Sequence, residues 1–362
     1  MYDQIRGNTL YIMLYAVVTT IAVIACCYLL FRRANAIAPD VTPPARLRCW
    51  TAAFFAAIGL NHVWYMPIFF LSSDQDILLA DLVGGLLDTM TVFPMAIIVM
   101  LVMLQDCRRP LWPVIVMLLP VVLAGVWCIA TRSYAIPPIG YIYLLLMWAG
   151  LIVYMIHALR QYGRWLRDNF ADLEHKEVWQ SFVVLSIMML FFGVYAVSGK
   201  GPVSQYIMQA VCIVLIVYLV WRAETLSDLS ILLLRQVESP VSSMSTSRVN
   251  NIGVLLKRYC EEPQLYLQYD ISVSKLAGQI GTNRAYLSKY FATQGTTYNA
   301  YINGLRIQHF IKLYHEAIAS QQSITAQELA HQSGFHSYST FSAAFKQSMG
   351  TTPTAWMRLS ES

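Results

Sequence analysis

Seven apolar blocks, each about as long as a membrane-crossing helix, fill most of the first 221 residues and constrain the fold more than any other feature. A hydrocarbon core about 30 Å thick is crossed by roughly 20 helical residues. Blocks of that length lie at 9–31, 50–71, 78–104, 111–130, 139–159, 178–198 and 205–221. The pattern predicts an all-α protein that begins with a seven-helix transmembrane bundle, with six or eight spans as the alternative counts.

Positive charge is distributed unevenly between the connections of these blocks. The connections after the first, third and fifth blocks contain ten Lys and Arg residues. The N-terminus and the connections after the second, fourth and sixth blocks contain only Arg6, Arg132 and Lys200. Cytoplasmic loops of membrane proteins are the ones enriched in Lys and Arg. We therefore expect the N-terminus outside, the lipid bilayer around the bundle, and the C-terminal part in the cytoplasm.

Composition changes after the seventh block. The whole chain is 57% apolar and 12% charged, but residues 248–362 resemble an ordinary soluble domain in composition. That segment has ten Lys and Arg against six Asp and Glu, a net charge of +4, and an excess of positive charge favours a polyanionic partner. We predict three parts: a membrane module at 1–221, a juxtamembrane helix and linker at 222–247, and a globular domain at 248–362.

Two related helix-turn-helix patterns occupy the globular domain. In each, a Leu-Ala pair precedes a glycine, and two apolar residues four positions apart then mark one face of a second helix. The glycine takes the turn conformation that bulkier residues resist. The two sets are Leu276, Ala277, Gly281, Leu287 and Phe291, and Leu329, Ala330, Gly334, Phe341 and Phe345. We predict recognition helices at 283–294 and 337–349, joined by one long helix at 297–319.

The runs YLSKYF, YINGLRI, SGF and TPTAWMR within these patterns resemble the DNA-binding domain of the AraC/XylS family, over about residues 249–358. The resemblance implies a bacterial transcription regulator whose two recognition helices enter successive major grooves of double-stranded promoter DNA. It further implies RNA polymerase as a protein partner and, together with the seven blocks, a multi-pass location in the cytoplasmic (inner) membrane. It implies a monomer on DNA, and a homodimer of the chain is left open.

The same resemblance assigns DNA contacts residue by residue. In the first unit it implies base contacts from Asn283, Arg284, Tyr286 and Ser288 and a phosphate contact from Lys289; in the second unit it implies contacts from His336, Ser337, Tyr338, Thr340 and Lys346. For Arg284 and Lys289 the alternative is a solvated surface charge. Ala343 occupies a position that is commonly Arg in the family, and Phe310 one that is usually small. Both departures imply weaker contact by the second unit.

Polar residues within the apolar blocks form a second candidate site. Asn61 and His62 fall near the middle of the second block and Asp88 near the middle of the third, at depths that allow them to meet. Ionisable groups are costly in a bilayer and mark functional sites. We interpret the three as a structural interhelical contact or as the floor of a pocket that senses an unknown small-molecule or membrane signal.

No motif in the sequence indicates an enzyme, a cofactor or a metal. The seven cysteines form no C-x-x-C pair, so neither a disulfide framework nor a zinc site is expected. The leading hypothesis is a one-component regulator whose membrane module modulates promoter binding. The alternatives are a transporter or membrane enzyme with an autoregulatory DNA-binding tail, and a regulator that the membrane anchors without sensing.

Overall fold

The computed structural model contains two compact units. The first comprises Met1–Arg160 and Val178–Leu229, and the second comprises Gln161–Glu177 and Ser230–Ser362. The structure describes residues 8–39, 41–197, 202–229, 252–321 and 324–361. Most of the juxtamembrane segment expected at 222–247 therefore lies outside the described residues. Within them every regular element is helical, as the sequence predicts.

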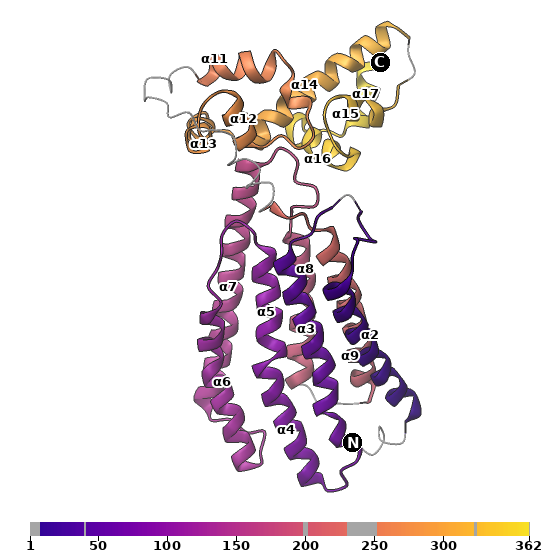
Figure 1. Ribbon diagram of the computed structural model, residues 1–362, viewed down its shortest axis with the longest axis vertical. Helices are drawn as coiled ribbons and strands as arrows, with labels where there is room; N and C mark the ends of the chain where they lie inside the picture. The colour runs from indigo at the N-terminus through magenta and orange to yellow at the C-terminus, as the bar shows by residue number, and fades with distance from the viewer. Residues whose placement is uncertain (1–7, 40, 198–201, 230–251, 322–323, 362) are drawn as a thin grey trace. The chain divides into compact units, whose positions relative to one another are not determined.

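The first unit is a bundle of long apolar helices (Figure 1). Its helices are α2 (Thr9–Phe31), α3 (Ala45–Trp64), α4 (Asp74–Met90), α5 (Val92–Met103), α6 (Trp112–Thr131), α7 (Pro138–Asn169, whose last turns belong to the second unit), α8 (Trp179–Val197) and α9 (Pro202–Thr225), with a short 3₁₀ turn, η1, at Met66–Phe69. Large apolar side chains such as Leu119, Leu145 and Leu190 are exposed on the outer surface of the bundle. An apolar exterior of this kind suits a lipid environment.

Six segments in the described part of the chain are long and apolar enough to cross a membrane, so the predicted count of seven is not reproduced by length and composition. The difference lies at the predicted sixth span, which falls on α8, where Trp179–Phe191 qualifies only as a shorter apolar helix. The other six predicted spans coincide with helical segments that meet both criteria.

The predicted third span is divided into α4 and α5 at Thr91, whose backbone dihedrals (φ −124°, ψ −68°) lie outside the helical region. Pro94 lies three residues further on. Because proline has no N–H and its ring clashes with the carbonyl four residues before it, the helix cannot continue regularly past Met90. This break follows directly after the turn that contains Asp88.

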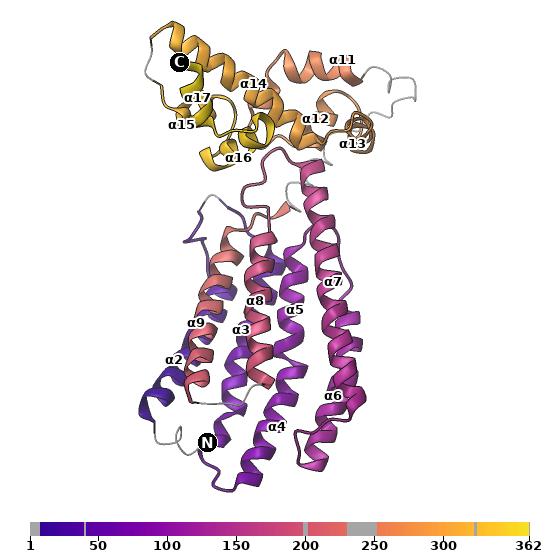
Figure 2. The same cartoon turned by 180° about the vertical axis from the view of Figure 1, so that it is seen from behind.

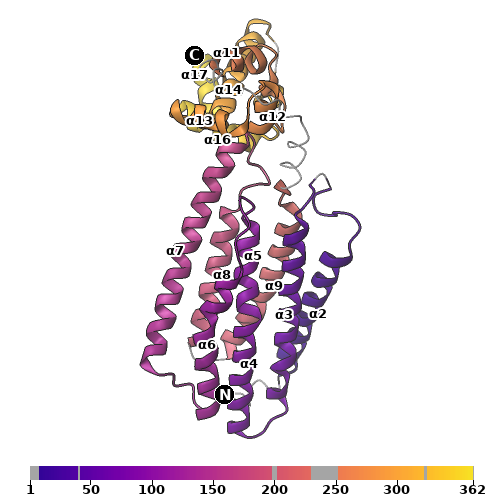
Figure 3. The ribbon, with the colours of Figure 1, turned by 60° about the vertical axis from the view of Figure 1, so that its left-hand side comes forward.

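Contacts within the bundle place α3 at its centre. α3 packs against α2, α5 and α9, while α4 packs against α5 and α6. Views from behind and from one side show α2 at one edge of the bundle and α6 with α7 at the other (Figures 2 and 3). The three polar residues singled out on α3 and α4 are shielded: His62 is buried, and Asn61 and Asp88 are half-buried.

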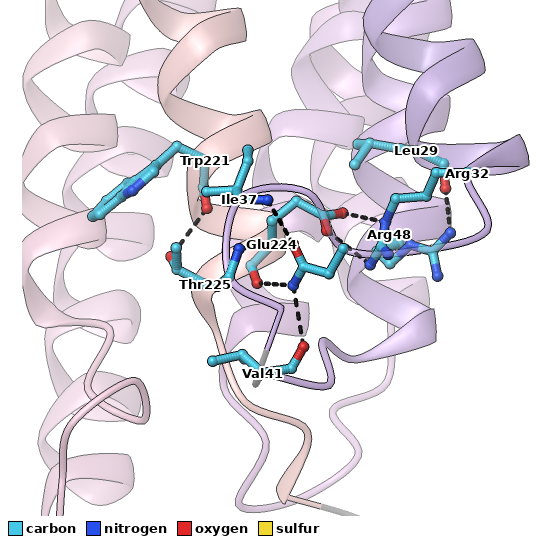
Figure 4. Close-up of polar contacts among 10 residues, drawn as sticks. Leu29, Arg32, Ile37, Val41, Arg48, Trp221, Glu224 and Thr225 are labelled. Carbon is cyan, nitrogen blue, oxygen red and sulfur yellow. Dashed lines mark hydrogen bonds and ion pairs between the residues drawn. The ribbon is translucent and has the colours of Figure 1, made fainter. Parts of the chain in front are cut away.

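A buried ion pair joins the last turn of α9 to the end of α2 (Figure 4). Arg32 Nε donates to Glu224 Oε1 at 2.8 Å, and its Nη2 lies 2.7 Å from Oε2, so the pair is bidentate. The Asn35 amide donates to the Glu224 carbonyl at 2.9 Å, and Arg48 donates to the Leu29 carbonyl at 2.6 Å. The end of α9, which precedes the segment leading to the C-terminal domain, is thus fixed to α2.

The second unit contains two small hydrophobic cores that share one long helix. Its main helices are α11 (Ile252–Leu256), α12 (Val273–Gln279), α13 (Arg284–Thr293), α14 (Tyr298–Ala319), α15 (Ala326–Gln332), α16 (Tyr338–Met349) and α17 (Pro353–Glu361). Helices α12 and α13 enclose the first core and α15 and α16 the second. Helix α14, which runs between the two halves of the unit (Figure 2), contributes Ile302 to the first core and Ile307 and Phe310 to the second. The predicted tandem units and their joining helix agree with these helices to within a residue or two.

Arg306 ties the two cores together from the middle of α14. Its side chain is buried, with 1% exposed. Nε donates to the Tyr266 carbonyl at 2.7 Å and Nη2 to the Gln268 carbonyl at 2.8 Å, and the guanidinium lies 5.5 Å from the centre of the Phe335 ring in the second core. Burial lowers the pKa of Arg306, but a guanidinium remains charged at neutral pH. This one cation therefore contacts groups of both cores.

Candidate DNA interface and intramembrane cavity

The first helix-turn-helix unit is formed by α12, a turn at Gly281 and α13. Gly281 has φ +70°, a conformation that residues with a Cβ rarely adopt. Leu287 and Phe291 are buried on one face of α13. Because these two residues fix the orientation of the helix, its opposite face, which carries Lys289, is exposed to solvent, and Arg284 is exposed in the first turn.

The residues predicted to contact DNA from this unit fall into two groups. Arg284, Tyr286 and Lys289 are exposed, and Ser288 is half-buried. Asn283 has a structural role, because it is the N-cap of α13 and its Oδ1 accepts from the Tyr286 N–H at 2.9 Å. Its amide nitrogen is the part of the side chain that the cap leaves available for a base.

The second unit repeats this arrangement with α15 and α16. Thr325 and Glu328 form the capping box that begins α15, as the sequence predicts. Gly334 has φ +87°, and a Cβ at this position would lie 2.7 Å from Leu267 Cα, so only glycine fits. Phe341 and Phe345 are buried in the second core, which orients α16 as Leu287 and Phe291 orient α13.

The five residues expected to contact DNA from the second unit differ in their surroundings. His336 and Lys346 are exposed. Ser337 is the N-cap of α16 and accepts from the Thr340 N–H at 3.3 Å. The half-buried Tyr338 packs on the second core, and the Thr340 hydroxyl lies 3.4 Å from a carboxylate oxygen of Glu174 within the same unit. Among the predicted contact residues, this unit therefore offers one exposed Lys or Arg, Lys346, whereas the first offers two.

Phe310 is a core residue rather than a surface substitution. It is completely buried, and its ring centre lies 4.5 Å from that of Phe341 and 5.7 Å from that of Phe345. Ring pairs at these separations stabilise a core beyond the area they bury. Phe310 therefore supports the packing that positions α16, and the weaker contact expected of the second unit rests on Ala343, which is exposed on α16 without a charge.

A short segment before α8 contacts the first core of the same unit. The Asn299 amide donates to the carbonyls of Phe170 at 3.2 Å and Ala171 at 2.6 Å, and Ala171 is buried among the residues of that core. Nothing in the sequence pattern indicates this packing, because residues 161–177 stand out there only as a basic connection. A backbone carbonyl that binds a distant asparagine leaves no local signature.

A cavity of about 560 Å³ lies within the membrane bundle, and it brings together the three polar residues singled out from the sequence. Asn61, His62 and Asp88 all line it, together with residues of α2, α6 and α9. Asp88 Oδ1 accepts from the Asn61 amide at 2.7 Å and from the Trp64 indole at 3.1 Å. The interhelical contact expected at this depth is therefore present, and Asn61 is the residue that makes it.

His62 has different partners from the expected Asp88. Its Nδ1 lies 2.9 Å from the Ile58 carbonyl, one turn earlier in α3, and its Nε2 lies 3.0 Å from the Gln209 side-chain amide on α9. The Tyr15 hydroxyl donates to the His62 carbonyl at 2.6 Å. His62 thus connects α3 to α2 and α9, whereas Asp88 connects α4 to α3. Gln209 and Tyr15 were not identified from the sequence, because the search considered residues such as Asp and His that can be charged near neutral pH.

Comparison with known proteins identifies the C-terminal part. Residues 276–359 match the family model of a helix-turn-helix domain. The chain is 32% identical over 82 residues to the TCP pilus virulence regulatory protein of Vibrio cholerae serotype O1, in both the Classical Ogawa 395 and El Tor Inaba N16961 strains; the match covers 23% of this chain and 28% of each relative. No solved structure matches. These matches and the geometry confirm an AraC-type helix-turn-helix domain at the C-terminal end.

Proposed function

We propose that the protein is a membrane-anchored transcription regulator that binds promoter DNA through both helix-turn-helix units, with its output modulated by the membrane bundle. The observation that carries the proposal is the pair of recognition helices, each fixed by a buried two-residue face so that its opposite face is exposed. Cations on those faces attract the phosphate backbone, and polar side chains read base edges.

The two units have unequal roles in this proposal. α13 presents Arg284 and Lys289 with Tyr286 between them, whereas α16 presents Lys346 alone among the predicted cations. We assign base discrimination chiefly to Arg284, since a guanidinium binds guanine in a bidentate manner, and phosphate contact to Lys289 and Lys346. RNA polymerase is the protein partner we expect at the promoter.

Membrane anchoring rests on the six apolar segments and their exposed apolar surface. We propose a bacterial cytoplasmic membrane that α8 also crosses, so that seven crossings put the N-terminus outside and the C-terminal domain in the cytoplasm. The Lys and Arg count favours this orientation, because it is highest in the connections after odd-numbered spans. A reporter active only outside the cytoplasm should be active when fused after Ser73 and silent after Arg109. The opposite pattern contradicts the orientation.

Promoter binding is tested with the full-length protein in nanodiscs. Fluorescence anisotropy with the duplex upstream of its own coding region should give an affinity that falls steeply with salt. Arg284→Ala should reduce the preference for that duplex over a scrambled one, whereas Lys289→Ala should weaken both duplexes equally and reduce the salt slope by about 1. Lys312, an exposed residue on α14, provides the matched control Lys312→Ala, which should change neither quantity. Affinity that is independent of salt and of all three residues contradicts the proposal.

A further inference from the structure

The cavity in the membrane bundle is partly open, so it is a pocket rather than an enclosed packing void. Protein interiors are close-packed, and voids larger than a few water molecules are rare. At about 560 Å³ this one falls in the size range of small-molecule binding sites. Its walls come from α2, α3, α4, α6 and α9, so a ligand there would touch most of the bundle.

The charge of the walls restricts what can bind. Of the described residues that line the cavity, two are carboxylic acids, Asp81 and Asp88, and none is Lys or Arg. Asp88 accepts from the neutral donors of Asn61 and Trp64, and Asp81 Oδ2 accepts from the Tyr134 hydroxyl at 2.7 Å. The neutral donors at Asp88 stabilise its carboxylate but do not cancel its charge, and in a medium of low dielectric constant the remaining field is strong.

His62 is not a hydrogen-bond partner of Asp88. Its Nδ1 lies 2.9 Å from the Ile58 carbonyl and its Nε2 lies 3.0 Å from Gln209 Oε1, so both ring nitrogens face oxygen acceptors on α3 and α9. Asp88 instead accepts from the neutral side chains of Asn61 and Trp64. Its carboxylate can therefore take an ammonium group of a ligand as a charged partner.

Aromatic rings line the rest of the cavity. Tyr11, Tyr15 and Phe69 form one cluster, in which the Tyr15 and Phe69 ring centres are 5.3 Å apart, and Tyr65 lies beside Gly84 and Gly85 of α4. Ring faces attract organic cations and also pack against apolar groups. Carboxylates and rings together are the two features that an amphipathic amine requires.

We propose that the cavity binds a small amphipathic organic cation, with its ammonium group at Asp88 and its apolar body among the tyrosine and phenylalanine rings. The binding itself rests only on the cavity. Its regulatory role rests on the proposed function: a ligand that contacts α9 at Gln209 shifts the equilibrium between arrangements of that helix, and the Arg32–Glu224 pair holds the end of α9 in one of them.

Three matched probes test the charge selectivity: 4-phenylbutylamine, 4-phenylbutanol and 4-phenylbutyrate, which share one apolar body. Binding to the full-length protein in nanodiscs is measured by equilibrium dialysis, with empty nanodiscs subtracted for partitioning. We expect the amine to bind at least about tenfold more tightly than the alcohol, and the butyrate to bind most weakly. Equal affinities for amine and alcohol overturn the proposal.

Asp88→Asn locates the site. The substituted amide keeps the Oδ1 acceptor used by Asn61 and Trp64, so the bundle should remain folded, and unchanged affinity for the alcohol verifies this. The variant should lose the preference for the amine, whereas Asp76→Asn, an exposed change on the same helix, should retain it. Retained preference in Asp88→Asn overturns the assignment. If the amine binds as expected but does not alter promoter affinity, the site is supported and its coupling to DNA binding is rejected.

Discussion

Replacing Arg306 by leucine should destabilise the C-terminal domain severely. The change removes hydrogen bonds of 2.7 and 2.8 Å to the carbonyls of Tyr266 and Gln268, in a position that is 1% exposed. A hydrogen bond to a charged group contributes about 1.5–3 kcal/mol, so the two together account for about 3–6 kcal/mol. That loss is comparable to the whole stability of a small domain, about 5–15 kcal/mol.

Urea unfolding of residues 248–362, expressed as a separate segment and followed by circular dichroism, measures this loss. Arg306→Lys should be intermediate, because an ammonium keeps the charge but not the forked geometry. Arg358→Leu, on the exposed surface of α17, is the matched control and should change the free energy of unfolding by no more than about 0.5 kcal/mol. A free energy of unfolding for Arg306→Leu within about 1 kcal/mol of the unaltered segment would refute the role of this residue as the tie between the cores.

Three further outcomes follow from the geometry. Gly334→Ala and Gly350→Ala should both cost about 1–2 kcal/mol for a left-handed backbone, but Gly334→Ala should cost clearly more in urea unfolding, because only its Cβ meets backbone atoms, those of Leu267. Hydrogen bonds from the Thr325 N–H and hydroxyl lower the pKa of Glu328, so its contribution to stability is present above the ordinary pKa of glutamate and disappears as pH falls through the lowered value; Glu328→Gln should flatten that part of the pH–stability curve, and an unchanged curve contradicts the capping box. Arg32→Ala leaves the Glu224 carboxylate buried without its ion-pair partner, which should cost about 3–5 kcal/mol, whereas the double change of Arg32 and Glu224 to methionine should cost less in thermal unfolding of the detergent-solubilised protein.

The helices that could be predicted are those with a local signature in the sequence. Apolar length located the spans, and the spacing of Leu287 with Phe291 and of Phe341 with Phe345 located the recognition helices, because both patterns follow from helix periodicity. The glycine turns were equally local. The division of the third span was also accessible, since Pro94 is a known helix breaker, but the long apolar block obscured it.

Contacts between distant segments had no such signature. From the sequence, Arg306 and Glu224 would be expected on the surface because they are charged, and only the tertiary packing shows that they are buried. The position of Asn61, His62 and Asp88 along their spans indicated that they could meet, and all three line one cavity. Position along a span could not give the rotation of α3, which directs Asn61 toward Asp88 and His62 toward Gln209.

The most direct test of promoter binding is chromatin occupancy by the full-length tagged protein in the cells that express it, measured genome-wide after crosslinking. We expect occupancy concentrated at promoters, lost when Arg284 and Lys289 are both changed to alanine and retained in Lys312→Ala, with the tagged protein in the membrane fraction throughout. Occupancy no greater than in untagged cells, or occupancy that survives the double change, would contradict the claim that this membrane protein binds promoters through its recognition helices.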